Sequence, residues 1–382
     1  MKKGYVLTPE KLDQYVRRRL FPEGASIDFI RHQEGVHLHL ATLPSELERR
    51  LQEEGIEAER IHQTNPREAI YNDGRNTYVA LSGGISRMQR YLDMKRWVEE
   101  CVAQMPQYRG TNIRFQHHYY NDSCEDTFAR FNQLDWELIK EVMSHKEFIE
   151  GLIGVLFNSV RIVREAFTNA GVSSSDFYRG EGWLAKEYLA YQFIRLPRGV
   201  VLNFDYSYGS QVGSIMEKLA KSIHRRVEEH EIDGRTITFG LFGKAGGLAP
   251  NLGLGALVAP NGYIANRRLI EVENQLTKSQ LSEDLVIGPN LPQRSVIKQK
   301  LGELEEGRRR GAIMVEMEMK DAVAAIEHIR NWGWLEDARF MYGVVISDLP
   351  LRGLTIEQED IEQEEVGLIR VLKGMLKVFD KG

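Results

Sequence analysis

The C-terminal half of the chain alternates short apolar runs with stretches of helical periodicity. Six apolar runs have strand character: Gly199–Phe204, Thr236–Phe242, Gly255–Ala259, Leu285–Ile287, Ala312–Val315 and Met341–Ile346. Helical patterns cover Gly213–Arg226, Met317–Arg330 and Glu364–Phe379. Strand–loop–helix alternation of this kind predicts an α/β fold with a mostly parallel central sheet covered by helices. Such sheets bind ligands at the carboxyl ends of their strands.

The N-terminal half has a different pattern, rich in charge and helical periodicity. Amphipathic helices are predicted at Leu43–Glu54, Arg87–Gln104 and Phe148–Asn169, and short strands at Val36–Leu40 and Thr77–Leu81. Loops are expected at Gly171–Ser175 and Asp176–Gly182. We therefore predict two domains: residues 1–185, a mixed, helix-rich accessory domain of unknown role, and residues 186–382, an α/β domain.

Composition narrows the classes of function. The 382 residues carry a formal net charge of −5 and are 42% hydrophobic, which suits a sizeable core but not binding to nucleic acid or to an anionic membrane. Cys101 and Cys124 lack metal-type spacing and fit a reducing cytoplasm. There is neither a signal-peptide pattern nor an apolar run long enough to span a membrane, so a cytoplasmic location is expected. The adjacent histidines in Arg114–Tyr120 are more typical of surface or core positions, and no metal site is predicted.

Two glycine-containing segments follow predicted strands. Gly243–Leu248 reads Gly-Lys-Ala-Gly-Gly-Leu, in which glycines permit close approach of the backbone to a ligand and Lys244 adds a cation. Tyr208–Gly213 precedes a helix, whose first N–H groups could bind a phosphate. Taken alone, each segment is more typical of an ordinary turn, with a surface lysine in the first and a serine cap in the second.

Two acidic segments complete the set. Val315–Glu318 reads Val-Glu-Met-Glu, where a carboxylate could accept hydrogen bonds from the vicinal hydroxyls of a sugar. Acidic residues at the start of a helix are also favoured by its dipole. In Ile346–Pro350, Asp348 follows a buried strand, where desolvation would raise its pKa and make it a general acid. An Asx turn before Pro350 is the alternative.

The order of these four segments resembles the nucleoside phosphorylase/nucleosidase superfamily over roughly residues 186–382. That resemblance implies a three-layer α/β/α domain, a small-molecule purine nucleoside or nucleotide as substrate, and a homo-oligomer. It implies no cofactor, although phosphate could serve as a co-substrate. Within the superfamily, Ser347–Gly353 (Ser-Asp-Leu-Pro-Leu-Arg-Gly) and Ala190–Pro197 are most similar to AMP nucleosidase, which also carries an extra N-terminal domain.

The resemblance also implies roles for particular residues. Asp348 would protonate the purine leaving group, and Glu318 would hold the ribose hydroxyls, with Met317 against the sugar and Glu316 as a further ribose contact. Gly246 and Gly247 would let the backbone approach sugar and base. The phosphate would be bound by Gly209, Ser210, Lys244 and Arg267, although the family usually has serine or threonine where Lys244 stands.

The predicted function is therefore cleavage of the N-glycosidic bond of a purine nucleoside or nucleotide, by hydrolysis as in AMP nucleosidase or by phosphorolysis. Two alternatives remain open. A fold does not determine a function, so the chain could be a non-catalytic nucleotide-binding or regulatory protein on the same fold. It could also be a structural or scaffold protein.

Overall fold

The structure, a computed structural model, describes residues 25–40, 42–65, 68–81, 115–118, 124–179, 189–205, 210–231, 236–278, 285–293, 301–353 and 361–381. The chain divides into two compact units, one of residues 6–134 and one of residues 135–382 together with residues 1–5. The division falls inside helix α5 (Cys124–Ser144).

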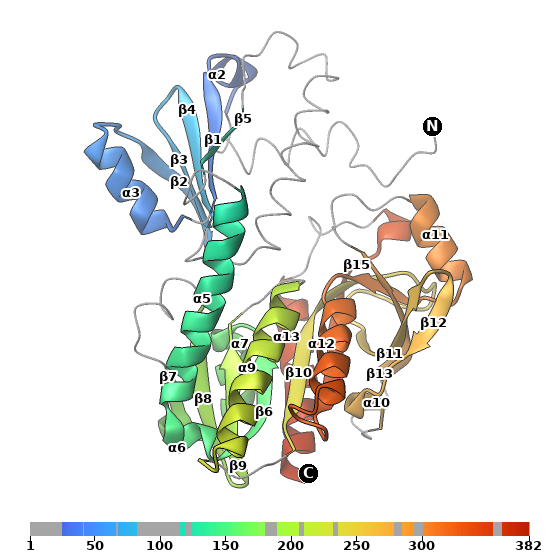
Figure 1. The fold of residues 1–382 in the computed structure, drawn as a ribbon. Coiled ribbons are helices and arrows are strands. Elements are labelled where there is room, and N and C mark those ends of the chain that lie inside the picture. Colours follow the sequence, from blue (N-terminus) through green and yellow to red (C-terminus); the bar gives the residue numbers. More distant parts are fainter. Residues whose placement is uncertain are drawn as a thin grey trace. The chain divides into compact units, whose positions relative to one another are not determined.

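The smaller unit is built on a five-stranded sheet with the order β2-β3-β4-β1-β5. Its strands are β1 (Gly35–Leu40), β2 (Glu59–Asn65), β3 (Glu68–Asn72), β4 (Asn76–Leu81) and β5 (Phe115–His118), and its helices are α2 (Ile27–Arg31) and α3 (Pro44–Glu53) (Figure 1). Strand β1 runs parallel to both of its neighbours, whereas β2, β3 and β4 form antiparallel pairs. The predicted strands at Val36–Leu40 and Thr77–Leu81 and the helix at Leu43–Glu54 are confirmed.

The larger unit contains a ten-stranded sheet. Nine of its strands follow the order β12-β11-β13-β14-β10-β6-β9-β8-β7. The tenth strand, β15, pairs with both β10 and β11. The strands are β6 (Leu152–Phe157), β7 (Phe177–Arg179), β8 (Tyr191–Leu196), β9 (Gly199–Phe204), β10 (Thr238–Gly247), β11 (Leu257–Ala265), β12 (Arg268–Glu271), β13 (Leu285–Pro292), β14 (Met314–Glu316) and β15 (Arg339–Asp348). The pairings of β10, β15, β11, β13 and β14 close on themselves, so these five strands form a small ring.

The sheet is mixed rather than mostly parallel, which corrects the prediction. Of the ten strand pairings among the described residues, five are parallel and five antiparallel. The antiparallel pairs include the hairpins β8–β9 and β11–β12, whose connections are too short for a helical crossover. The closed ring contains two further antiparallel pairs, β10 with β14 and β15 with β11.

Helices cover the sheet in pairs. Helices α7 (Val160–Thr168) and α13 (Ile361–Lys381) pack together, and their apolar residues share one core cluster with β6, β8, β9, β10 and β15. Helices α9 (Ser210–Glu228) and α12 (Met319–Asn331) form the second pair and lie in front of β6 and β10 in Figure 1, with α13 behind. The shorter helices are α6 (Lys146–Ile149), α10 (Gln275–Lys278) and α11 (Leu301–Arg309). Among the described helices, none combines the length and the apolar character needed to cross a bilayer.

Three predictions in the middle of the chain differ from the structure. Phe148–Asn169 is not one helix but the end of α6, strand β6 and helix α7. Because β6 pairs with β9 and β10 in the large sheet, the two units divide at residues 134 and 135 rather than at 185. The predicted loop Asp176–Gly182 contains the edge strand β7, which pairs with β8. The helix predicted at Arg87–Gln104 lies outside the described residues.

Candidate active site

The centre of the candidate site is the end of β10, between β14 and β15. Gly246 pairs with Asp348 of β15 on one side and with Val315 of β14 on the other, beside a register shift between Ala245 and Gly246. A Cβ atom at Gly246 would lie 2.9 Å from Val315 Cγ1 and 3.0 Å from the Asp348 carboxylate oxygen Oδ2. Glycine is needed here for close approach, and this gathers three predicted site segments at one point.

The glycine-rich segment Gly243–Leu248 was expected to be a turn after a strand. The structure instead continues β10 to Gly247, hydrogen-bonded to β15 and then to β14. Both neighbouring strands extend this far, so the backbone groups of the glycines are satisfied in a ladder and need no turn. Lys244 is therefore a partly buried strand residue opposite Val345.

Asp348 ends β15 as a buried residue, with 8% of its surface exposed. The hydroxyl of Ser347 lies 3.1 Å from Asp348 Oδ1 and 3.5 Å from the carbonyl oxygen of Ala245. The 3-10 helix η3 (Pro350–Arg352) then turns the chain away. The prediction that this aspartate emerges from a buried strand into a desolvated position is confirmed.

Glu316 is held at the end of β14 by donors from three other parts of the fold. The Tyr342 hydroxyl donates to Oε2 at 2.6 Å, and the Asn290 side-chain amide donates to Oε1. The backbone N–H groups of Glu318 and Met319 also donate to the carboxylate, at 2.5 and 3.0 Å to Oε2. Burial raises the pKa of Glu316, and these hydrogen bonds act in the opposite direction.

The two glutamates therefore have different positions. Glu316 is 3% exposed and its carboxylate caps the first N–H groups of α12, which is the helix-start role that the sequence left as an alternative. Its acceptor capacity is taken by protein donors, which leaves little for a sugar. Glu318 stands at the N-cap of α12, is partly exposed, and does not cap the helix with its side chain. Met317, between them, is also partly exposed.

The predicted phosphate ligands are not all gathered at this point. Arg267 lies in the β11–β12 hairpin turn with a φ of 67°, is exposed, and its carbonyl oxygen accepts a hydrogen bond from Arg310 at 3.3 Å. It lines a cavity of about 560 Å³ together with residues of α11, including Glu306. Ser210 is the first residue of α9, and Gly209 lies outside the described residues.

The sequence did not single out the asparagines and the tyrosine that organise the strand ends. Asn290 and Tyr342 fix Glu316, and Asn274 donates to the carbonyl oxygens of Pro260 and Tyr342 at 2.8 and 2.7 Å. Asn158 joins β6 to β10 by donating to the Phe242 carbonyl oxygen at 2.7 Å. All the asparagines named here are buried. For Asn158 and Asn290 the available signal was an asparagine directly after or within an apolar strand, where burial demands hydrogen-bond partners.

Comparison with known proteins gives similarity at the level of solved structures. No protein-family model matches the chain, and no curated protein matches it. A uridine phosphorylase from Schistosoma mansoni in complex with thymidine is 16% identical, covers 62% of this chain and 89% of its own, and has a TM-score of 0.46. A methylthioadenosine/S-adenosylhomocysteine nucleosidase from Campylobacter jejuni is 13% identical, covers 59% and 100%, and has a TM-score of 0.41. A nucleosidase of the same name from Neisseria meningitidis, in complex with methylthio-immucillin-A, is 10% identical, covers 59% and 99%, and has a TM-score of 0.41.

Proposed function

We propose that the larger unit cleaves the N-glycosidic bond of a purine nucleoside or nucleotide. The observation that carries this proposal is the meeting of three segments at Gly246: the buried Asp348, the end of β10, and β14 leading directly into Glu316–Glu318. A buried acid at the end of β15 and a partly exposed carboxylate just after β14, on the two strands that flank β10, suit the two halves of a nucleoside.

Asp348 is the general acid in this mechanism. It donates a proton to a ring nitrogen of the purine as the bond from the anomeric carbon breaks and its electron pair moves to the base. Positive charge then develops on the sugar, and water or phosphate attacks the anomeric carbon. Whether water or hydrogen phosphate attacks, the proton that this nucleophile loses returns to the Asp348 carboxylate. At 8% exposure the carboxyl group is largely shielded from bulk water.

Glu318 binds the ribose, because a carboxylate can accept hydrogen bonds from two vicinal hydroxyls. Its backbone position is set by the N–H bond to Glu316, so Glu316 acts as a positioning residue rather than as a direct ligand. Met317 supplies an apolar contact to the sugar. Together these assignments divide the Val-Glu-Met-Glu segment into one anchor and two binding residues.

A third group of residues is proposed to bind phosphate, whether or not phosphate is also the nucleophile. Lys244 and the start of α9 at Ser210, together with Gly209, are proposed for the phosphate of a nucleotide or for inorganic phosphate. Arg267, on the β11–β12 turn beside α11, also stays a proposed phosphate ligand. The homo-oligomer and the AMP nucleosidase-like substrate remain proposals that rest on the sequence resemblance.

The experiment incubates the full chain with purine nucleosides and nucleotides, with and without phosphate, and measures free base by chromatography. Release without phosphate indicates hydrolysis, and release only with phosphate indicates phosphorolysis. Asp348→Asn should lower kcat by about 100-fold or more, a loss typical of acid–base catalysis. The control is Asp337→Asn, at an exposed position just before the same strand begins.

Three results would count against the proposal. Nucleotide binding without release of base, across the panel, would favour a non-catalytic nucleotide-binding protein. If the Asp348→Asn variant releases base as fast as the unaltered chain, Asp348 is not the acid. Absence of any thermal shift with all nucleotides would favour a structural role.

A further inference from the structure

Arginine side chains gather between the β11–β12 hairpin and the end of α11. A cavity of about 560 Å³ lies there and is lined by Arg267 of the hairpin turn and by Arg309 and Arg310 from the end of α11. The other charged residues in its described lining are Glu303 and Glu306. Three guanidinium groups therefore face two carboxylates, and the described lining has a net positive charge.

The Glu306 carboxylate lies among these arginines. Arg309 Nη2 is 2.9 Å from Glu306 Oε2, and Arg310 Nη2 is 2.5 Å from Oε1. The hydrogen bond from Arg310 and the charges of Arg309 and Arg267 hold the pKa of Glu306 below its ordinary value. Both ion pairs are largely accessible to solvent, and such pairs contribute little to stability. The arginines can therefore rearrange around a second anion at small cost.

Arg267 occupies a backbone position that favours glycine. Asn266 and Arg267 form the two-residue turn between Ala265 and Arg268, which pair with each other in the β11–β12 register. The φ angles of Asn266 and Arg267 are 47° and 67°, both in the left-handed region. Hairpin turns of this kind favour asparagine followed by glycine, because asparagine tolerates the left-handed region and glycine adopts it freely. The turn therefore holds Arg267 in a strained conformation that a glycine would relieve.

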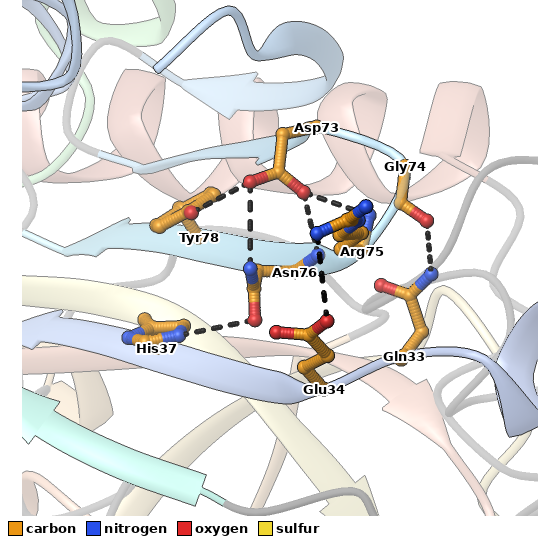
Figure 2. Close-up of polar contacts among 8 residues, drawn as sticks. All are labelled: Gln33, Glu34, His37, Asp73, Gly74, Arg75, Asn76 and Tyr78. Carbon is orange, nitrogen blue, oxygen red and sulfur yellow. Dashed lines mark hydrogen bonds and ion pairs between the residues drawn. The ribbon is translucent and has the colours of Figure 1, made fainter. Parts of the chain in front are cut away.

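The β3–β4 turn of the smaller unit shows that a short hairpin turn does not require a strained arginine (Figure 2). Its left-handed residue is Gly74, with a φ of 88°, while its arginine, Arg75, does not have a positive φ. Asp73 Oδ1 accepts hydrogen bonds from the backbone N–H groups of Arg75 and Asn76 at 2.8 and 2.6 Å, which fixes this turn. Strained residues concentrate at functional sites. The strain at Arg267 therefore points to a role for its side chain.

The cavity adjoins the strand that leads into the candidate ribose ligands. Ile264 and Leu291 line the cavity and pack in the same apolar cluster as Val315 of β14. The backbone N–H of Gln293, another lining residue, donates to the Glu316 carbonyl oxygen at 2.8 Å. A ligand in the cavity would therefore lie beside the end of β14.

We propose that Arg267, Arg309 and Arg310 bind a phosphate group in this cavity, either that of inorganic phosphate or that of a sugar phosphate. A guanidinium group pairs with phosphate oxygens through two parallel hydrogen bonds, which makes arginine clusters well suited to this ligand. The site extends the assignment of Arg267 as a phosphate ligand, and it lies on other elements than Lys244 and Ser210. Binding of phosphate here does not require that the larger unit cleave a nucleoside.

The experiment titrates the full chain with inorganic phosphate and with ribose 5-phosphate by calorimetry at low ionic strength, and uses ribose as the uncharged control. We expect at least one of the two phosphate probes to bind, and its affinity to fall as salt screens the arginines. Arg309→Gln should weaken this binding by about 10-fold, as expected for the loss of one charged hydrogen-bond donor. A larger effect on ribose 5-phosphate identifies a sugar phosphate as the ligand, and an equal or larger effect on inorganic phosphate identifies the free ion.

The Arg267→Gly variant gives a sharper test, because binding and stability should not fall together. Glycine adopts the left-handed region without strain, so the midpoint of thermal unfolding should be unchanged or higher. Phosphate affinity should nevertheless fall by about 10-fold, because one guanidinium group is lost. The control is Arg75→Gln, which removes an arginine of the β3–β4 turn that is 78% exposed and 3.9 Å from Glu34 (Figure 2) and should leave phosphate affinity unchanged.

A measurement on the unaltered protein covers the case in which a variant does not fold. Phenylglyoxal modifies exposed arginines, and mass spectrometry locates the modified residues. Saturating phosphate should protect Arg267 and Arg309 but not Arg75. The proposal is overturned by three results: no binding of either phosphate probe, unchanged affinity in the folded double variant Arg267→Gly/Arg309→Gln, or equal modification of Arg267 and Arg309 with and without phosphate.

Discussion

The buried network around Glu316 predicts a specific loss when its phenolic donor is removed. Tyr342→Phe deletes only the hydroxyl that donates to Glu316 Oε2 at 2.6 Å, and leaves the aromatic ring in the core of β15. A hydrogen bond to a charged group contributes about 1.5–3 kcal/mol, against about 0.5–1.5 kcal/mol for a neutral pair. We therefore expect the variant to lose about 1.5–3 kcal/mol when Glu316 is ionised, or roughly 3–12 °C in Tm for a domain of this size.

The direction of the pH dependence follows from the pKa of Glu316. Burial raises this pKa above its ordinary value of 4.5, so the folded unit binds the proton more firmly than the unfolded chain does. The stabilisation from that proton is complete below the ordinary value and is lost as pH rises through the raised pKa. The Tyr342 hydroxyl favours the ionised carboxylate, so its removal should cost more at about pH 9 than at about pH 5, where the loss falls toward 0.5–1.5 kcal/mol.

Urea unfolding followed by tryptophan fluorescence and circular dichroism measures this difference. The control is Tyr178→Phe, because Tyr178 is 37% exposed on the edge strand β7 and its hydroxyl removal should change stability by less than about 0.5 kcal/mol. An equal loss in Tyr342→Phe at both pH values would refute the coupling to Glu316. A loss no larger than that of the control would refute the hydrogen bond itself.

Three further predictions test neighbouring features. Gly246→Ala should destabilise the larger unit by about 1–3 kcal/mol and lower any cleavage activity, because its Cβ would lie 2.9 Å from Val315 Cγ1, whereas Gly302→Ala on α11 meets no atom within 4 Å and should be neutral or stabilising in thermal unfolding. Glu318→Gln should raise KM or lower kcat for a ribonucleoside more than for its 2′-deoxy analogue, while Glu327→Gln, exposed on the same helix, should change neither; equal effects on both substrates would argue against ribose binding. Because burial lowers the pKa of His37, its contribution to stability is present above about pH 6.5 and is lost as pH falls through the folded pKa, and an NMR titration that places the His37 pKa at or above its ordinary value would contradict this.

Much of the architecture could be predicted from the chain alone. Apolar runs located β9, β11 and β15, and the helical period of apolar residues located α9 and α12. The burial of Asp348 also followed from local sequence, since it directly continues an apolar strand. These features depend on residues close together in the chain.

Other features depended on residues far apart in the chain. Leu152–Phe157 is a short apolar run that reads equally well as helix or strand, and only its pairing with β9 and β10 decides for strand and assigns it to the larger unit. The glycines of β10 look like a turn until β14 and β15 are placed beside them. Which of the strands β10, β15, β11, β13 and β14 run parallel to each other likewise depends on how they close into a ring.

The segment Glu316–Glu318 shows the same division at the scale of single residues. From sequence alone, two glutamates beside one methionine are equivalent candidates for binding ribose. In the fold, Asn290 and Tyr342 reach Glu316 from β13 and β15 and occupy its carboxylate, whereas Glu318 stays partly exposed at the start of α12. Local sequence therefore determined which residue types stand at the strand ends. Tertiary structure decided which carboxylate is buried among donors from distant strands, because those donors reach it only once the sheet has assembled.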